Sequence, residues 1–378
     1  MANGYATPLL THITAVAGTN PAKKLAPLGM LSMVLTAMDG STQLLNTRDD
    51  SGHRRDLTVK YRKRVLESAV SDQGMNCEGG ATPAYNEFGL PTMLNRTYQL
   101  WVPDTLIRQY TKDTSDFVTM DGGVPNIRKQ TNAMKEVYDM FIEGAGAVLK
   151  SINRSLVTAM ATQFGVNTVT GSNAARALSF NLGTTGMNDA MVQLIADWRE
   201  NEFNDSVMMV GNGPFANYDM IRQIMSSQAS AQGISQAALA NMIPKVYFDK
   251  DTRAIWGANQ VGVFEKGSVH LLSCNDYAGN FARTIANSTF FTMALPVSEF
   301  SGIPVENLDK LLFDIQVKEF DCAQSLVING VATQTSGPGV LININKQYNL
   351  FTKPGFIYDA ADPLFGTNGT LRYTITGS

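Results

Sequence analysis

Residues 132–164 read NAMKEVYDMFIEGAGAVLKSINRSLVTAMATQF, and the rest of the chain is arranged around this stretch. Its apolar residues recur every three or four positions, which is the spacing of one face of an α-helix: Met134, Val137, Phe141, Ala145, Val148, Ile152, Leu156, Ala159 and Met160. The charged residues lie off that face: Lys135, Glu136, Asp139, Glu143, Lys150 and Arg154. The spacing predicts one helix over 132–164, roughly 45 Å long, which ends at Gly165.

Two glycines, Gly144 and Gly146, flank Ala145 in the middle of this helix. A glycine inside a helix costs about 1 kcal/mol relative to alanine. We therefore predict a bend at this point. An ordinary buried helix is the alternative, and the segments on either side decide between the two.

The composition is globular. Of 378 residues, 44% are hydrophobic and 17% charged, and the net charge of −3 argues against a chain-wide basic surface for nucleic acid. Cys77, Cys274 and Cys322 are far apart and odd in number, which argues against a disulfide scaffold or a zinc ribbon. The N-terminus has no signal-peptide pattern, and the most apolar early segment is too short to cross a bilayer. We expect an intracellular chain without a membrane span.

The segments before the long helix suggest parts that depend on another surface. Residues 1–52 have little regular pattern apart from a helical piece near 22–38, and we interpret them as an arm. Residues 56–70 and 92–102 have strand character and are separated by a polar, glycine-bearing stretch, which predicts a protruding β-hairpin. Its first strand is the most basic part of the chain, through Arg54, Arg55, Lys60, Arg62, Lys63 and Arg64. A solvated strand face explains this patch, and contact with an acidic neighbouring subunit is the other interpretation.

The remaining pattern separates into an α/β part and a β part. A short helix at 104–112 and a loop at 113–126 lead into the long helix. Beyond it, helices at 184–201, 215–228 and 235–242 alternate with strands at 206–210, 245–248, 261–264 and 268–273, which predicts an α/β lobe over roughly 165–290. Residues 290–378 are β-rich, with a period of two at 311–318 and 340–345 and further strands at 356–358 and 371–375. Because these strands need the long helix to cover one face, the α/β lobe is interpreted as an insertion.

No motif in the sequence proposes a reaction. His12, His53 and His270 do not occur in metal-ligand spacing. The segment 262–268 lacks the order of a phosphate loop, and the glycines at 211 and 213 lack a dinucleotide-binding fingerprint. We therefore predict no catalytic residue, no metal and no cofactor.

The order of parts resembles that of the major capsid proteins of tailed bacteriophages, the Hong Kong 97-type shell fold that encapsulins share. The resemblance covers nearly the whole chain and rests on a series of local phrases in a shared order: KYRKRVLESAV (60–70), CEGG (77–80), YNEFG (85–89), NRTYQLWVPDTLIRQYTKD (95–113), NDAMVQLIADWRENEFNDSVMMVGNGPF (188–215), QVGVFEKGSVHLL (260–272) and GVLININKQYNLFTKPGFIYDAADPLFGTNGTLRYTI (339–375).

The resemblance implies an α+β fold with named parts. These are an N-terminal arm at 1–52, an extended hairpin called the E-loop at 53–103, the first part of the P-domain with its spine helix at 104–164, an inserted α/β A-domain at 165–290, and the second part of the P-domain at 291–378. Candidate contacts between subunits are the six basic residues together with Glu78, Tyr85 and Glu87. A bend at Gly144 and Gly146 would let one spine helix fit positions of different curvature.

The implied function is self-assembly without catalysis. Pentamers and hexamers would form an icosahedral head shell around the double-stranded DNA of a tailed phage, held by confinement and weak contacts. The implied partners are a separate scaffolding protein, a portal protein and decoration proteins, and the implied location is the virion, after synthesis in the host cytoplasm. Two alternatives stay open: an encapsulin-like compartment and an unrecognised α/β enzyme.

Overall fold

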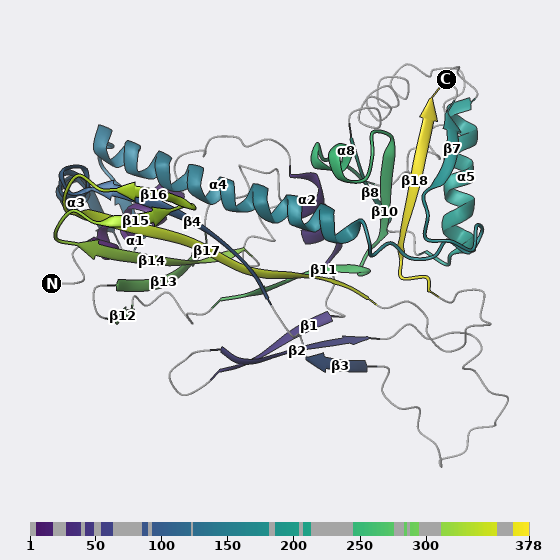
Figure 1. The fold of residues 1–378 in the computed structure, drawn as a ribbon, viewed down its shortest axis with the longest axis horizontal. Coiled ribbons are helices and arrows are strands. Elements are labelled where there is room, and N and C mark those ends of the chain that lie inside the picture. The colour runs from purple at the N-terminus through teal and green to yellow at the C-terminus, as the bar shows by residue number, and fades with distance from the viewer. Residues whose placement is uncertain are drawn as a thin grey trace, which may run out of the picture.

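The computed structural model describes residues 5–17, 28–38, 42–48, 54–62, 85–89, 93–121, 124–180, 186–203, 207–212, 245–275, 283–285, 288–294, 311–353 and 366–377. These residues form an elongated mixed α/β body (Figure 1). The long helix α4 lies over a six-stranded sheet, a five-stranded sheet with helix α5 forms one end, and a three-stranded sheet lies below. The predicted mixture of helices and sheets is confirmed.

The central strand of the six-stranded sheet is β17 (Gly339–Thr352). Strand β4 (Leu94–Pro103) pairs with it along one edge. Along the other edge lie β14 (Leu312–Phe320) and β11 (Val269–Cys274), end to end, because Gln347 and Tyr348 pair with β4 and β11 at once. Strands β13 (Ser288–Ala294) and β12 (Arg283–Ile285) continue the sheet beyond β14.

A buried lysine fills the point where β14 and β11 meet. Lys346 Nζ donates hydrogen bonds to Ser273 Oγ on β11 and to the carbonyl of Leu312 at the start of β14. Burial lowers the pKa of Lys346 to about 8. On this edge of β17, β14 pairs as far as Asn345 and the pairing with β11 begins at Gln347. Lys346 lies between the two and supplies polar contacts to both strands.

Helix α4 (Asn132–Met160) confirms the predicted apolar face. Every residue of that face is buried except Ala159, which is half-buried. Tyr138, Ile142, Leu149 and Val157 are buried as well, so most of the helix circumference faces protein. The N-terminus is capped by Thr131, whose Oγ1 accepts a hydrogen bond from Met134 N at 3.3 Å.

The predicted end of this helix at Gly165 is wrong, because the helix ends at Met160. Residues 161–163 form a turn. Gly165 N donates to the carbonyl oxygen of Thr370 at 3.0 Å, whereas in a continuing helix it would donate to Ala161. The chain thus leaves the helix to meet the start of the last strand, a partner more than 200 residues away in sequence.

The five-stranded sheet has the order β7 (Arg176–Phe180), β18 (Thr370–Gly377), β10 (Gln260–Glu265), β8 (Val207–Gly211) and β9 (Lys245–Phe248). The pairs β7–β18 and β8–β9 are parallel, and the other two are antiparallel. Helix α5 (Gly186–Glu200) contributes Leu194 and Trp198 to the apolar cluster on one face. A short helix, α8 (Asp251–Ile255), precedes β10.

Both faces of β8 are buried, and each belongs to a different core. Val207 and Met209 lie in the cluster with α5, whereas Met208 and Val210 belong to the main core that α4 shares with the six-stranded sheet. This follows from the alternation of side chains along a strand. The two sheets are therefore joined through one continuous apolar core.

The sheets divide the chain differently from the boundaries expected from the sequence. Strands β11 and β12 come from residues 165–290 but pair in the six-stranded sheet. Strand β18 comes from residues 291–378 but pairs in the five-stranded sheet. Which strands pair depends on contacts between residues far apart in the sequence. A local pattern can therefore predict that a strand forms, but it cannot predict which sheet the strand joins.

Two helices near the N-terminus pack into the chain's own core. Helix α1 (Ala6–Ala17) was not predicted, and α2 (Gly29–Ala37) occupies part of the expected piece at 22–38. Leu9, Ile13 and Leu31 are among their residues in the main core. The surface on which this part of the expected arm depends is therefore the chain's own core, where α2 packs against α4, β8 and β11.

The predicted pairing of residues 56–70 with 92–102 is also wrong. Strand β2 (Arg54–Arg62) pairs with β1 (Thr42–Arg48) and β3 (Tyr85–Gly89), and these three form a separate sheet. The strand expected at 92–102 corresponds to β4, which pairs with β17 over ten residues. Pairing with the long, largely apolar strand β17 buries more of the side chains of β4 than pairing in an exposed hairpin would.

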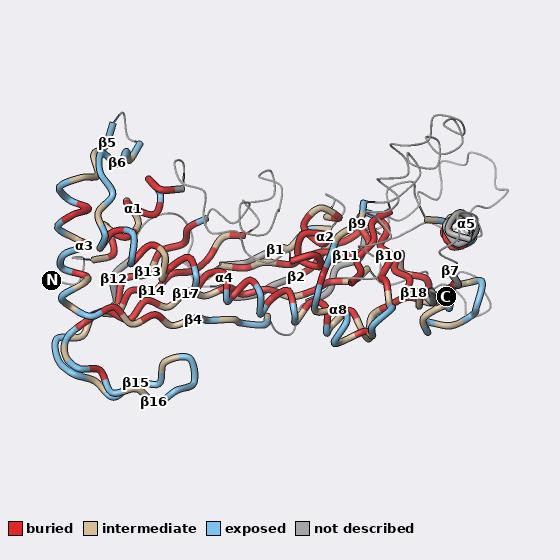
Figure 2. The backbone as a smooth tube through the Cα atoms, turned by 90° about the horizontal axis from the view of Figure 1, so that it is seen from above, coloured by how far each residue is buried: buried red, intermediate tan, exposed pale blue. Residues whose placement is uncertain are grey.

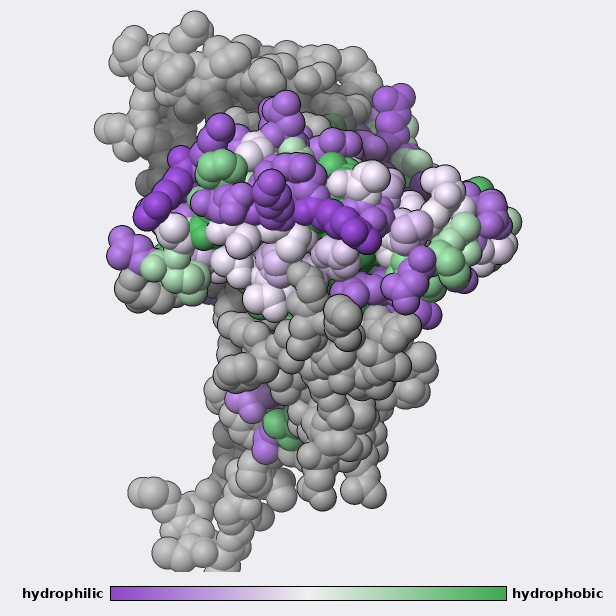
Figure 3. Space-filling model, turned by 90° about the vertical axis from the view of Figure 1, so that its left-hand side faces the viewer, coloured by the Kyte–Doolittle hydropathy of each residue, from purple (hydrophilic) through white to green (hydrophobic). Residues whose placement is uncertain are grey.

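Two small hairpins stand at one end of the body (Figure 2), the end that faces the viewer in Figure 3. Helix α3 (Asp104–Phe117) is longer than the predicted 104–112, and β5 (Val118–Asp121) with β6 (Val124–Ile127) occupies much of the expected loop. Strands β15 (Ser325–Ile328) and β16 (Val331–Gln334) form the second hairpin. The elements expected at 215–228, 235–242 and 356–358 lie outside the described residues.

Candidate subunit-contact site

The three-stranded sheet carries most of the contact residues expected from the sequence. One face of β2 is buried on the body, where Val59 and Tyr61 pack with Leu272 and Phe351. The rings of Tyr61 and Phe351 lie 5.4 Å apart between centroids. Alternation then places Lys60, which is half-buried, on the opposite face.

The register of this sheet brings residues of opposite charge together within one chain. Lys60 pairs with Glu87 of β3, and Arg62 pairs with Tyr85. Residues directly opposite in an antiparallel pair share a face. An acidic residue of the same chain thus stands opposite the basic strand, which the sequence pattern alone did not indicate.

The remaining contact candidates are distributed unevenly. Arg54 and Arg55 begin β2, so four of the six basic residues lie on that strand. Lys63, Arg64 and Glu78 lie outside the described residues. In addition, Leu45 of β1 is 43% exposed and pairs with Thr58 of β2. The face of this sheet that is turned away from the body therefore carries both an apolar residue, Leu45, and a charged residue, Lys60.

The two glycines of the spine lie inside one continuous helix, and both are buried. A Cβ at Gly144 would stand 2.6 Å from Cδ1 of Tyr98 on β4. Glycine at this position thus permits close approach of the helix to the sheet. The bend inferred for Gly144 and Gly146 stays a prediction.

A buried polar junction, which no local sequence pattern indicated, joins α2, α4 and the end of β9. Asp249 Oδ2 accepts hydrogen bonds from Met30 N and from Asn153 Nδ2, each at 2.8 Å. Asn153 Oδ1 accepts from Leu31 N at 2.9 Å. The two side chains therefore satisfy free N–H groups at the start of α2. Burial raises the pKa of Asp249, and hydrogen bonds to its carboxylate oppose this effect.

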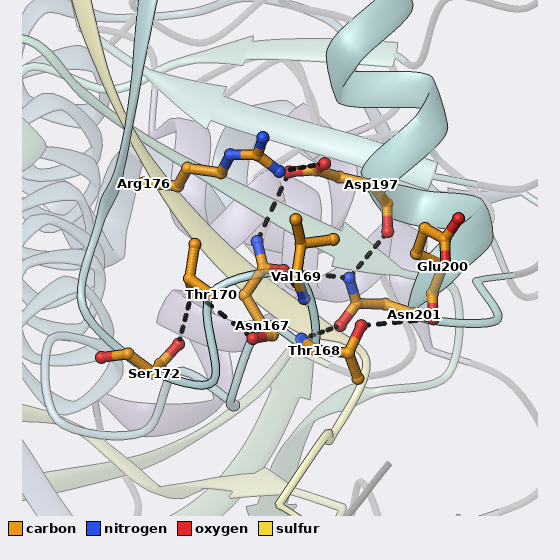
Figure 4. Close-up of polar contacts among 9 residues, drawn as sticks. All are labelled: Asn167, Thr168, Val169, Thr170, Ser172, Arg176, Asp197, Glu200 and Asn201. Carbon is orange, nitrogen blue, oxygen red and sulfur yellow. Dashed lines mark hydrogen bonds and ion pairs between the residues drawn. The ribbon is translucent and has the colours of Figure 1, made fainter. Parts of the chain in front are cut away.

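A second polar junction holds the turn between α4 and β7 to the last turn of α5 (Figure 4). Thr168 N donates to Asn201 Oδ1 at 2.9 Å, and Asn201 Nδ2 donates to the carbonyl of Asp197 at 2.7 Å. Arg176 on β7 forms an ion pair with Asp197. The cluster therefore fastens the turn that follows α4 to the end of α5, and β7 to α5.

A buried histidine connects α1 to the core. His12 is fully buried, its Nδ1 lies 3.0 Å from Tyr110 Oη on α3, and its ring stands edge-on to Tyr110 and Tyr138. Burial lowers its pKa to about 4. The imidazole is therefore neutral near pH 7.

Among the described residues, no group of three or more histidine, cysteine or acidic side chains is arranged to hold a metal ion. In the same part of the chain, no helix is both long enough and apolar enough to cross a membrane. The buried side chains of Lys346, Asp249, Asn153 and Asn201 are each hydrogen-bonded within the fold. Their arrangement orients structural elements and presents no set of groups converging on a substrate.

No family model matches this sequence, and no curated protein matches it. Among solved structures, the chain is similar to the capsid of the cyanophage P-SCSP1u, with 9% identity, a TM-score of 0.35, and coverage of 85% of this chain and 84% of that one. It is similar to the capsid of an empty GTA particle, with 10% identity, a TM-score of 0.35 and 96% coverage of each chain. It is also similar to the capsid of the Myoviridae phage XM1, with 11% identity, a TM-score of 0.34, and coverage of 88% and 84%. The function proposed below rests on the contacts within this chain.

Proposed function

We propose that this chain is the major capsid protein of a tailed bacteriophage, with the Hong Kong 97-type fold. In this proposal α4 is the spine helix, the six-stranded sheet is the core of the P-domain, and the five-stranded sheet with α5 belongs to the A-domain. The β1–β3 sheet is the base of the E-loop. The domain ranges expected from the sequence are then revised, so that β4, β11 and β12 join the P-domain and β18 joins the A-domain.

The observation that carries the proposal is the way the β1–β3 sheet is attached. Its buried side chains Val59 and Tyr61 contact Leu272 and Phe351, whereas Leu45 on the other face is 43% exposed. Among the described strands, β1 and β3 each pair only with β2, so both have an open edge. A small sheet that is partly exposed and has two edges unpaired among the described strands gains stability from a neighbouring surface. In a shell, that surface is the adjacent subunit.

The body has the properties of a rigid building block. Two sheets share one apolar core, and buried polar junctions fasten α2, α4, β9 and α5. Copies of a rigid block that meet head to tail close into a ring when the rotation between neighbours divides a full turn, and pentamers and hexamers are rings of this kind.

The proposal extends to partners and location. A scaffolding protein would guide assembly, a portal protein would occupy one vertex, and decoration proteins would bind the finished shell in the virion. The genome of double-stranded DNA would be held by confinement, since a net charge of −3 gives the chain little general attraction for phosphates.

Negative-stain microscopy of the chain, expressed alone and together with its gene neighbours, tests this function. We expect closed shells or rings of six subunits, and packaging of DNA when the full gene set is present. A chain that stays monomeric even with the scaffolding protein present contradicts the proposal. Shells that enclose a protein cargo and no DNA contradict the phage assignment while keeping the shell.

A further inference from the structure

A reciprocal contact joins the turn of the β15–β16 hairpin to strand β4. Gln99 N donates to Asn329 Oδ1 at 2.8 Å, and Asn329 Nδ2 donates to the carbonyl of Gln99 at 2.9 Å. In return, Asn329 N donates to Gln99 Oε1 at 3.0 Å. Each residue thus uses its side-chain amide to pair with the backbone of the other. Figure 2 shows the hairpin leaving the end of the body and running alongside β4.

This contact lies on an unpaired edge of the main sheet. Among the described strands, β4 pairs with β17 alone. Alternate residues of an edge strand direct their N–H and C=O groups away from the partner strand. Gln99 is one of these residues, because both of its backbone groups bond to Asn329 and not to β17. The amide of Asn329 therefore occupies the positions that the peptide group of an added strand would take.

The hairpin turn presents this amide in a fixed direction. Asn329 and Gly330 have φ values of 50° and 83°, and Ile328 pairs with Val331 on either side of them. Two consecutive residues with positive φ form the tight turn that asparagine followed by glycine favours. Glycine at position 329 would keep this turn and remove only the amide. The two roles of Asn329, in the turn and on the edge, can therefore be separated.

We propose that Asn329 guards the edge of β4 and prevents it from pairing with β4 of a second copy of this chain. An open strand edge is a template for pairing with another chain. An antiparallel edge is complementary to itself around a two-fold axis, so a second copy presents the matching partner. Such a pair would divert subunits from any other assembly. The inference needs only the described contact and does not depend on the proposed function.

Hydrogen exchange of the full-length chain tests the guard directly. In Asn329→Gly, measured by mass spectrometry under dilute conditions, we expect peptides that contain Gln99 to exchange roughly 2- to 10-fold faster than in the natural chain, because one hydrogen bond contributes a factor of this size. As the concentration rises, dimers should appear in sedimentation, and protection of the same peptides should return. Unchanged exchange in the dilute sample contradicts the proposal that Asn329 protects the edge of β4. Faster exchange without any dimer at higher concentration overturns the β4–β4 pairing.

A second variant separates the edge from the apolar surface of the hairpin. Val327 and Val331 are 63% and 65% exposed and could join two chains by themselves. Val327→Thr with Val331→Thr, added to Asn329→Gly, keeps the β4 edge open while making the hairpin polar. Persistence of the dimer supports pairing through β4. Loss of the dimer overturns it and identifies the hairpin as the contact.

Discussion

Tyr98 lies where a side chain on Gly144 would have to be. A Cβ at Gly144 would stand 2.6 Å from Tyr98 Cδ1 and 3.1 Å from Ile344 Cδ1. Tyr98 belongs to β4 and Ile344 to β17, so both central strands approach the middle of α4 at this residue. The spine therefore rests on the sheet at a point where it carries no side chain.

Gly144→Ala should destabilise the chain. The added methyl group would force Tyr98 or the helix to move, and such overpacking costs about 1–3 kcal/mol. The better helix propensity of alanine returns up to about 1 kcal/mol. We expect a lower free energy of unfolding, measured by urea denaturation. A double-mutant cycle with Tyr98→Ala should show a coupling energy between the two sites. Additive effects would mean that Tyr98 is not the obstacle.

Gly146→Ala tests the predicted bend of the spine at the second glycine. At Gly144, a Cβ would meet Tyr98, so a change there alters packing as well as helix stiffness. If a flexible spine fits one sequence to different curvatures, a stiffer helix should change the size distribution or the yield of shells seen by electron microscopy. Unchanged size and yield would show that the glycine serves packing only.

Asn153→Ala should weaken the junction of α2, α4 and β9. The substitution removes the acceptor for Leu31 N and one donor to Asp249, and both groups are buried. A buried polar group without a partner costs about 1–3 kcal/mol. Thermal unfolding should report the loss. Ser151→Ala is a matched control, because Ser151 lies on the same helix but is exposed. Equal effects of the two substitutions would contradict the role of the junction.

Acid should destabilise the docking of α1 through His12. Burial lowers the pKa of His12 from 6.5 to about 4, so the unfolded chain binds the proton more readily. The stability that comes from the neutral ring is present above pH 6.5 and is lost progressively as the pH falls towards 4. The whole shift corresponds to roughly 3 kcal/mol.

Urea denaturation at several values between pH 7.5 and 4 measures this dependence. His12→Gln cannot take up a proton in the range, and comparison at each pH cancels the contribution of all other groups. We expect the difference between the natural chain and the variant to change with pH in the stated direction. A constant difference would show that the histidine does not titrate with folding.

Replacement of residues 63–84 by a short glycine–serine linker should leave a folded subunit that forms no shells. The linker keeps β2 and β3, whose Val59 and Tyr61 contacts hold the small sheet on the body. Circular dichroism should therefore show a cooperative thermal transition like that of the natural chain. Normal shells in the electron microscope would refute the proposal that residues 63–84 take part in contacts between subunits.

Local patterns predicted those elements that bury one regular face. The apolar spacing over 132–164 predicted α4, and the alternation at 311–318 and 340–345 predicted β14 and β17. In each case the period of the side chains records which face meets the core. The strand at 245–248 has the bounds that the sequence predicted, and the turn-forming residues Pro244 and Asp249 flank it. By contrast, α1 was missed because its helical face is interrupted by threonines and His12, which is apolar only in its neutral, buried form.

The sequence by itself determined the spine, the presence of a mixed fold and the lack of a catalytic motif, because these follow from residue types and short-range spacing. Only the tertiary structure decided which strands pair. In the structure, β4 belongs to the main sheet and not to the expected hairpin. Strand β11 lies in the six-stranded sheet, β18 lies in the five-stranded sheet, and Tyr98 packs against Gly144. Pairing depends on burial and hydrogen bonds between residues up to hundreds of positions apart, and no local period encodes that choice. For the same reason, the contacts of Asn153 with Asp249 and of Asn329 with Gln99 became visible only in the fold.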